Sequence, residues 1–275
     1  MMAVLNVTPD SFSDGGRYLD DEGALRGAFM EEARCFVADG ALVLDLGGES
    51  TRPGAMAVPA DEERSRILPA LAALRADPVT SAAVLSIDTR HGSVAAAGLA
   101  AGADVINDVS GGADPALLEA VAASEAGLVL GHLRGVPATM MERIEFTALL
   151  EEVTSELGVS IERAEAAGID RRRILIDPGV GFGKTPGQSA ALVASGAALE
   201  RRLGCSVLIG ASRKRFIGDV TGRPKAERLA GSVGAAVAAV RHGARMVRVH
   251  DVAATVDALA VWRLIEQEAR REGVA

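Results

Sequence analysis

Short apolar runs rich in β-branched residues alternate along the chain with longer amphipathic stretches rich in Ala and Leu. The short runs are typical of strands buried in a parallel sheet, and the longer stretches indicate helices that cover it. The pattern predicts eight strands: Ala3 to Val7, Ala41 to Leu46, Ala83 to Asp88, Val105 to Asp108, Leu128 to His132, Ile174 to Asp177, Ser206 to Gly210 and Met246 to His250. It also predicts eight helices: Glu22 to Ala38, Asp61 to Arg75, Ser93 to Ala101, Pro115 to Glu125, Thr147 to Ala167, Gln188 to Arg202, Lys225 to Arg241 and Ala253 to Arg271.

This strict alternation predicts a fold of the α/β class, a single (β/α)8 TIM barrel. A doubly wound sheet usually closes with fewer units, and 275 residues fall within the range of one barrel. No linker rich in Pro, Gly or Ser divides the chain, so we expect residues 1–275 to form one domain. Gly40, Gly102 and Gly168 follow predicted helices, and Asp114 before Pro115 is typical of a helix start.

Composition narrows the possible functions. A net charge of −8 and only eight aromatic residues (6 Phe, 1 Tyr and 1 Trp) argue against nucleic acid as a partner. Apolar runs fall short of the roughly 18 residues that a membrane helix needs, and the first residues lack a basic leader, so we expect a soluble, uncleaved chain. Cys35 and Cys205 are distant from each other, which predicts buried, reduced thiols in a cytoplasmic protein.

Polar residues stand at the predicted strand ends, where the active site of a TIM barrel forms. A single Asp or Asn after a strand is most often a turn former or a helix cap. Here every predicted strand end carries a polar group, which a purely structural role does not explain. These groups are Asn6, Asp45, Asp88, Asn107, His132, Asp177, the run Ser212-Arg213-Lys214-Arg215, and Arg248 with His250.

Asp88, Asn107 and Asp177 are expected to converge over the barrel mouth from the third, fourth and sixth strands. A carboxylate accepts paired N–H donors, while Asn supplies one donor and one acceptor, so the cluster suits a planar heterocycle such as a pterin or a purine. General acid–base catalysis by paired carboxylates is the alternative.

Four groups of positive or titratable character, Arg52, Lys214, Arg248 and His250, are expected on loops after the second, seventh and eighth strands. That end of a barrel often binds phosphate, so these groups are candidates to hold an anionic leaving group. A solvated basic turn is the alternative for the run around Lys214.

Two loops rich in Gly, Ser, Asp and Pro, at residues 6–16 and 47–54, fit segments that close over a site. Phe12 in the first of them is a candidate to pack onto a ligand ring. The segment from Pro178 to Thr185 resembles a phosphate-binding loop, but Pro178 stands where that motif requires glycine, which argues against a nucleotide triphosphatase.

Seven ordered motifs resemble the dihydropteroate synthase family of pterin-binding enzymes. They are LNVTPDSFSDGG from Leu5, DLGGESTRPGA from Asp45, SIDT from Ser86, INDVSGG from Ile106, DPGVGFGKT from Asp177, GASRKRFIG from Gly210 and RVHDV from Arg248. Their order and spacing match the family from about the first strand to the last helix. The fifth strand departs from the family, which more often has methionine before the histidine, where Gly131 stands here.

The resemblance implies a homodimeric enzyme of folate biosynthesis, of the kind targeted by sulfonamides. It implies that 6-hydroxymethyl-7,8-dihydropterin diphosphate condenses with 4-aminobenzoate, with help from Mg²⁺, to give dihydropteroate and diphosphate. Lys214, Asp88 and Arg248 are the catalytic residues it implies. By ligand, the implied residues are Asp88, Asn107, Asp177 and Lys214 for the pterin; Arg248 and His250 for the diphosphate; Thr51, Arg52, Pro53, Phe182, Ser212 and Lys214 for the aminobenzoate; Asn6 for Mg²⁺; and Phe12 for loop closure.

Two other functions stay open from the sequence. One is a methyltransferase of the same pterin-binding barrel group, although that group is not expected to keep the Gly-Glu-Ser-Thr-Arg-Pro loop or the Ser-Arg-Lys turn. The other is a non-catalytic pterin-binding paralogue, for which the loss of Lys214, Arg248 or Asp177 would be the mark; all three are present.

Overall fold

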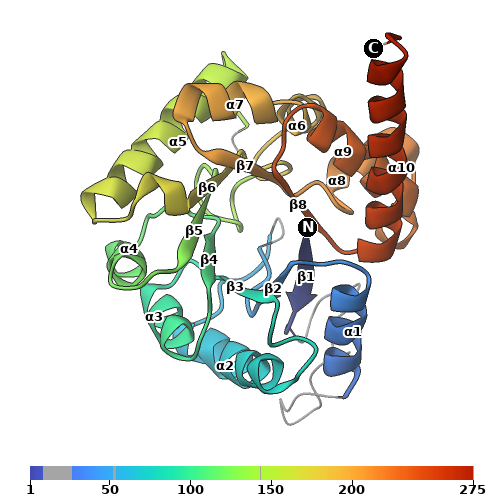
Figure 1. Cartoon of the computed structure of the whole chain (residues 1–275). Coiled ribbons are helices and arrows are strands. Elements are labelled where there is room, and N and C mark those ends of the chain that lie inside the picture. Colours follow the sequence, from blue (N-terminus) through green and yellow to red (C-terminus); the bar gives the residue numbers. More distant parts are fainter. Residues whose placement is uncertain (9–26, 52–53, 143, 275) are drawn as a thin grey trace.

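The computed structural model describes residues 1–8, 27–51, 54–142 and 144–274. Eight parallel strands form a closed barrel in sequence order, which confirms the predicted TIM barrel (Figure 1). The strands are β1 (Met2–Asn6), β2 (Val43–Gly47), β3 (Val84–Asp88), β4 (Val105–Asp108), β5 (Gly127–Gly131), β6 (Ile174–Asp177), β7 (Ser206–Ile209) and β8 (Met246–Val249). Each overlaps a predicted strand, and the ends differ by two residues at most.

Helices ring the barrel. They are α1 (Gly27–Ala38), α2 (Ala60–Ala76), α3 (Gly92–Ala100), α4 (Pro115–Ala122), α5 (Leu149–Ala166), α6 (Pro186–Val193), α7 (Gly196–Leu203), α8 (Arg215–Thr221), α9 (Leu229–Arg241) and α10 (Val252–Arg271). Asp114 caps α4 by accepting from the backbone N–H of Ala116, and Gly40, Gly102 and Gly168 have positive φ, as expected after helices. The start of the first predicted helix, from residue 22, lies outside the described residues.

Two helix predictions are wrong, and one helix was not predicted. The single helix expected over Gln188 to Arg202 is two, α6 and α7, because Gly196 begins α7 against the backbone of the 242–244 turn; a Cβ there would lie 2.6 Å from the Ala244 nitrogen. The sequence pattern missed α8, a helix of seven residues. The helix expected from Lys225 begins instead at Leu229, after a short 3-10 turn.

The core has two parts. A large apolar cluster fills the space between the strands and the helices. A smaller cluster of strand residues, Met2, Val43, Val129 and Leu208, packs within the barrel. Because side chains alternate between the two faces of a strand, the next inward positions after Met2 and Val43 are Val4 and Asp45. The barrel interior therefore changes from apolar to polar toward the strand ends.

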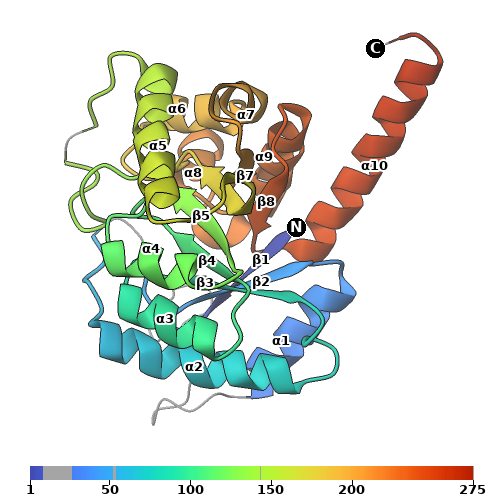
Figure 2. The same ribbon diagram turned by 60° about the vertical axis from the view of Figure 1, so that its left-hand side comes forward.

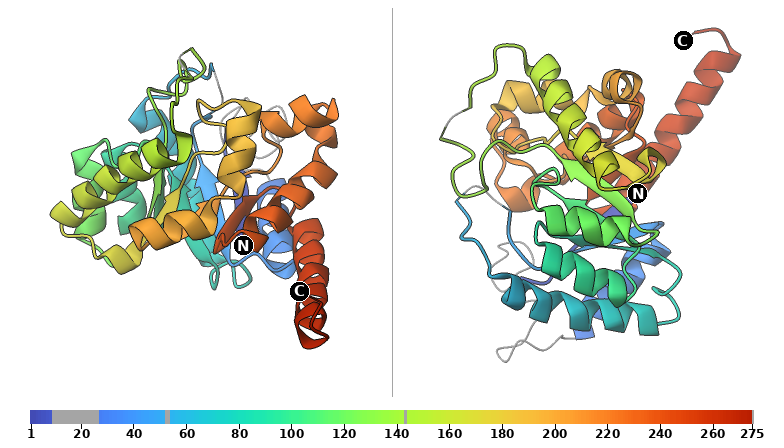
Figure 3. Two further views of the ribbon diagram at one scale, coloured as in Figure 1. Left: turned by 90° about the horizontal axis from the view of Figure 1, so that it is seen from above. Right: turned by 90° about the vertical axis from the view of Figure 1, so that its left-hand side faces the viewer.

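The exposure of the cysteines and the character of the helices bear on two further predictions. Cys205 is buried as predicted, but Cys35 is exposed, because it lies on the outer side of α1. None of the described helices is long and apolar enough to cross a membrane. The far half of α10 extends beyond the barrel and exposes Val261, Leu264 and Ile265 (Figures 2 and 3).

Candidate active site

Strand register brings the predicted polar residues together. Asn6 pairs with Gly47, Gly47 with Asp88, and Asp88 with Asn107 across four neighbouring strands. On the other side of the barrel Gly131 pairs with Asp177. The side chains at this level therefore belong to one layer at the carboxyl ends of the strands, which is where they were predicted to converge.

Asp45 and Arg248 lie deeper than predicted. Asp45 was expected at a strand end and Arg248 on a loop, but both lie inside strands, β2 and β8. Asp45 is fully buried and accepts hydrogen bonds from Ser86 Oγ (2.5 Å), Asn107 Nδ2 (3.1 Å) and Arg248 Nε (2.6 Å). Both positions fall within the predicted strands, but their side chains were expected at the mouth of the barrel, because charged residues are rare inside barrels unless they are paired, as they are here.

Arg248 joins two carboxylates. Besides Asp45 it donates from Nη2 to Asp88 Oδ2 at 2.8 Å. Burial raises the pKa of Asp88 well above its usual range; Arg248 opposes this shift and Asp45 adds to it. We call Asp45, Asp88, Asn107, Asp177 and Arg248 the floor of the site.

Asp177 completes the floor from β6. Its Oδ1 accepts from the Gly179 backbone N–H at 2.8 Å, and burial raises its pKa against this hydrogen bond and the charge of Lys214. The floor residues other than Asp45 border a small cavity of about 60 Å³. Its lining also includes Thr51, Val109, Gly131, His132, Gly179, Phe182, Gly210 and Lys214. The four residues predicted to hold a pterin, Asp88, Asn107, Asp177 and Lys214, therefore border one cavity.

The turn after β7 forms the opposite wall. Ser212 Oγ lies 3.0 Å from His250 Nδ1 and accepts from the His250 backbone N–H at 3.2 Å. Arg213 adopts a left-handed backbone with φ of 56°, unusual for a residue other than glycine, and its N–H donates to Ser232 Oγ at 2.9 Å. Arg228 donates to the carbonyls of Arg213 and Lys214, at 3.2 Å each. We call Ser212, Arg213, Lys214, Arg228 and His250 the rim.

Lys214 lies where floor and rim meet. Its Nζ stands 3.8 Å above the centre of the Phe182 ring, a cation–π contact. Burial lowers the pKa of Lys214 to about 8, against the pull of Asp177 and Asp88. Gly181 makes room for this lysine: its φ is +78°, and a Cβ would lie 3.2 Å from Lys214 Cδ.

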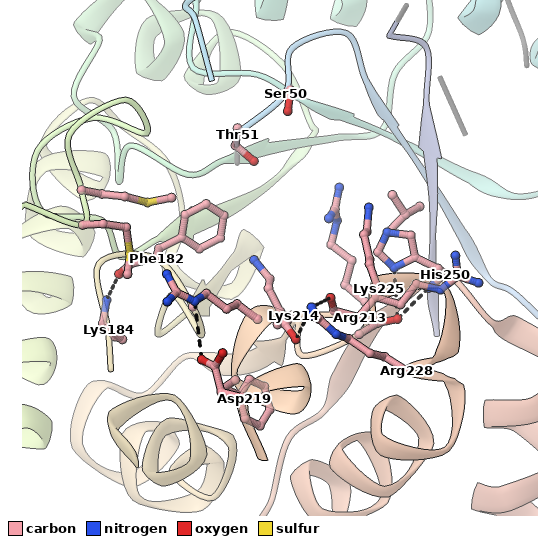
Figure 4. Close-up of a pocket in the computed structure, with 18 of the residues that line it drawn as sticks. Ser50, Thr51, Phe182, Lys184, Arg213, Lys214, Asp219, Lys225, Arg228 and His250 are labelled. Atoms are coloured by element: carbon pink, nitrogen blue, oxygen red, sulfur yellow. Dashed lines mark hydrogen bonds and ion pairs between the residues drawn. The ribbon is translucent and has the colours of Figure 1, made fainter. Parts of the chain in front are cut away.

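A larger cavity of about 610 Å³ opens beside the small one. Figure 4 shows Ser50 and Thr51, on the loop after β2, above the part of it that Phe182 and Lys214 border. Among its described lining residues are seven Lys and Arg side chains and three Asp and Glu side chains, which makes it a site for an anion. Burial and the nearby cations lower the pKa of His250 well below its usual value, so this imidazole is neutral at pH 7.

The larger cavity contains most of the remaining predicted residues. Asn6, Thr51, Phe182, Ser212 and His250 all line it. The predictions for Phe12, Arg52 and Pro53 fall outside the described residues.

Sequence reasoning missed several lining residues. Arg228, Lys225, Lys184, Met140 and Met141 were not singled out. The glycines of the segment after β6 were a usable signal for Lys184. Gly179 has φ of +73°, and a Cβ there would lie 1.9 Å from the His132 carbonyl oxygen, so this turn packs directly on the end of β5.

The Mg²⁺ prediction is consistent with the space above Gly47. A Cβ at Gly47 would lie 3.1 Å from Asn6 Oδ1 and 4.0 Å from Asp88 Oδ2, so the glycine leaves room between two oxygen ligands of the type that Mg²⁺ prefers. Among the described residues no group of three or more His, Cys, Asp and Glu side chains could hold a metal. An ion here would take most of its ligands from phosphate oxygens and water.

Comparisons with known proteins agree with this geometry. Residues 2–250 match the family model described as "Pterin binding enzyme". The dihydropteroate synthase of Mycobacterium leprae is 43% identical, over 95% of this chain and 91% of that protein. The chain belongs to the dihydropteroate synthase family.

Solved structures of the family share the whole fold. The Xanthomonas albilineans dihydropteroate synthase with 4-aminobenzoic acid has a TM-score of 0.86 at 45% identity and covers 96% of this chain and 92% of its own. The Burkholderia cenocepacia dihydropteroate synthase complexed with 7,8-dihydropteroate has a TM-score of 0.84 at 41% identity, covering 98% and 92%. The chain spans about half the length of the Arabidopsis thaliana folate synthesis bifunctional proteins, which are 35% and 37% identical to it.

Proposed function

We propose that this protein is a dihydropteroate synthase that condenses 6-hydroxymethyl-7,8-dihydropterin diphosphate with 4-aminobenzoate. One observation carries the proposal: a small cavity lined by two carboxylates and one side-chain amide opens into a large cationic one, and Thr51, Asp88, Phe182, Lys214 and Arg248 line both. Such a junction suits a substrate with a flat hydrogen-bonding ring at one end and a diphosphate at the other.

The floor binds the pterin ring. Asp177 accepts N–H donors from the amino-pyrimidine edge, while Asp88 and Asn107 contact the ring from the neighbouring strands. Arg248 forms ion pairs with both Asp45 and Asp88, which offsets part of their negative charge beneath the ring and holds the two carboxylates in place.

The rim receives the diphosphate, together with Arg248. As the C–O bond to the diphosphate breaks, its electron pair leaves with the diphosphate oxygen, and the cations stabilise that charge. His250 acts as a neutral hydrogen-bond donor, since its pKa is low. Asn6 helps to hold Mg²⁺, which when bound supplies further charge stabilisation to the phosphate oxygens.

Alignment of 4-aminobenzoate with the pterin supplies the rest of the rate acceleration. Thr51, Phe182 and Ser212 hold 4-aminobenzoate with its amine toward the pterin methylene carbon. The amine lone pair forms the C–N bond and the nitrogen then releases a proton. No side-chain nucleophile is required, and alignment of the two reactants lowers the barrier.

The test is a mass-spectrometric assay for dihydropteroate in a mixture of protein, pterin diphosphate, 4-aminobenzoate and Mg²⁺. We expect product from the wild-type protein, loss of product with Lys214→Ala, and no change with Arg172→Ala, an exposed residue before β6. Pterin binding without product from the wild type would instead favour a methyltransferase or a non-catalytic paralogue.

We also propose a homodimer in the cytoplasm. The exposed apolar residues of α10 support a second copy as partner, while the small residues of α9 (Ser232, Ala236 and Ala239) are buried within their own chain. The two free cysteines suit a reducing compartment. Light scattering that gives a mass near the 28.2 kDa of one chain would contradict the dimer.

A further inference from the structure

A second buried lysine lies behind Phe182. Lys184 is only 3% exposed, and its Nζ donates to the Phe182 carbonyl at 2.8 Å (Figure 4). The same Nζ lies 2.9 Å from His132 Nδ1. Two lysines therefore bracket Phe182: Lys214 contacts the face of the ring and Lys184 the backbone.

Burial determines which atom donates and which accepts in the hydrogen bond between Lys184 and His132. Burial and the charge of Lys184 lower the pKa of His132, so its imidazole is neutral. Burial also lowers the pKa of Lys184, to about 7. Because His132 Nδ1 accepts from Lys184, the proton of the neutral ring is on Nε2, which donates to Glu156 Oε2 at 2.9 Å.

The contacts continue to the loop after β5. Glu156, on α5, accepts from Arg134 Nε at 3.0 Å. Arg134 stacks 4.0 Å above the Phe146 ring and donates to the Glu145 carbonyl at 2.5 Å. This loop carries Met140 and Met141 of the larger cavity. One chain of hydrogen bonds thus joins the turn that carries Phe182 to β5, to α5 and to a second cavity wall.

We propose that Lys184 and His132 are positioning residues that set Phe182, and through it the binding of 4-aminobenzoate. Lys184 fixes the Phe182 carbonyl against the end of β5, and His132 fixes Lys184. The inference rests on the proposed function for its substrate, but the hydrogen-bond chain and its effect on the turn do not.

The kinetic test replaces Lys184 with Met, which keeps the length of the side chain and removes its donors. We expect the KM for 4-aminobenzoate to rise about tenfold, with the KM for pterin diphosphate within about twofold of wild type. The matched control is Arg173→Met, which removes a part-buried cation that holds the carbonyls of Val121 and Ala126 at the opposite end of β6. That variant should lose stability and keep both KM values.

Two substitutions of His132 test whether its hydrogen bond or only its packing matters. His132→Asn keeps an acceptor near the place of Nδ1 and should retain a KM near wild type, whereas His132→Leu should raise it as Lys184→Met does. Equal changes in both KM values, or a Lys184→Met variant that behaves like Arg173→Met, would overturn the proposal. If Lys184→Met does not fold, the comparison of His132→Asn with His132→Leu still tests the positioning role.

A structural readout is independent of activity. Amide hydrogen exchange of residues 179–185 should be about tenfold faster in Lys184→Met and unchanged in Arg173→Met. If wild-type protein forms no dihydropteroate, the proposed function fails while the exchange result still decides the positioning role. If the wild type is active but exchange and KM are both unchanged in Lys184→Met, only the positioning role fails.

Discussion

The floor and the rim of this site both contain charged side chains but hold them in different ways. On the floor, Arg248 is bound to Asp45 and Asp88, and all three come from strands whose register fixes their distances. On the rim, the backbone is fixed instead, by Arg228 through two carbonyls and by Ser232 through one N–H. The rim thereby leaves positive charge facing the cavity, whereas the cation of the floor is paired with two of its three carboxylates.

Because the floor and the rim hold their charges differently, we expect them to recognise ligands in different ways. A floor whose charged groups are held by ion pairs and hydrogen bonds selects a ligand by the arrangement of its hydrogen bonds, because an unpaired polar group there costs free energy. A rim with excess positive charge attracts any anion of suitable size and stabilises charge that develops on it. One site can therefore bind a neutral ring tightly and still favour departure of a diphosphate.

The largest effect should come from breaking the floor at Arg248. Arg248→Met leaves Asp45 and Asp88 buried without their ion-pair partner, so we expect the free energy of unfolding to fall by about 3–5 kcal/mol. Binding of pterin diphosphate should weaken far more than binding of 4-aminobenzoate. Urea unfolding and calorimetric titration of each ligand would measure the two effects.

The matched rim variant is Arg213→Met, which removes an ion pair with Asp251. Both partners of that pair reach solvent, so we expect a stability loss of about 1 kcal/mol or less. Equal losses in the two variants would mean that floor and rim are not held differently.

A smaller effect should come from filling space on the floor. A Cβ at Gly131 would lie 2.8 Å from Val109 Cα, whereas one at Gly210, which lines the same cavity, would find its nearest neighbour at 3.6 Å. We expect Gly131→Ala to lower the free energy of unfolding by about 1–3 kcal/mol, because the crowded atom is backbone. Gly210→Ala should change it by less. Thermal unfolding of the two variants together checks this, and equal melting temperatures would contradict it.

The same contrast explains what the sequence could predict. Asp88, Asn107 and Asp177 were found because strand ends in a barrel meet by topology, and motif order placed Lys214, Ser212 and His250. The pairing of Asp45 with Arg248 joins residues 203 positions apart and depends on barrel closure. No local pattern indicates such a pair.

Rim contacts were harder to predict for a different reason. Arg228 acts through backbone carbonyls, and any surface arginine has the same sequence signature. Lys184 was visible only as part of a segment resembling a phosphate-binding loop, whose glycines prove to serve close approaches to His132 and Lys214. Short helices such as α8 lack the length over which periodicity can be detected.

The smallest effect concerns the lysine at which floor and rim meet. Lys214 has a pKa lowered to about 8 by burial, so it carries its charge below that pH and loses it above. We expect kcat/KM to fall as pH rises past about 8, because a neutral amine no longer stabilises the anion or contacts the Phe182 ring as a cation. Lys214→Arg stays charged, so that variant should lack this decline even if its overall activity is lower.

Stability should change in the opposite direction over the same range. Between about pH 8 and the ordinary lysine pKa near 10.5, the unfolded chain holds a proton that folded Lys214 has released. The unfolded state then binds more protons, so the contribution of Lys214 to the free energy of unfolding rises with pH across this window. Subtracting the Lys214→Arg curve from the wild-type curve isolates that rise. A flat difference, with activity still falling above pH 8, would assign the activity loss to another group and leave Lys214 as a fixed charge.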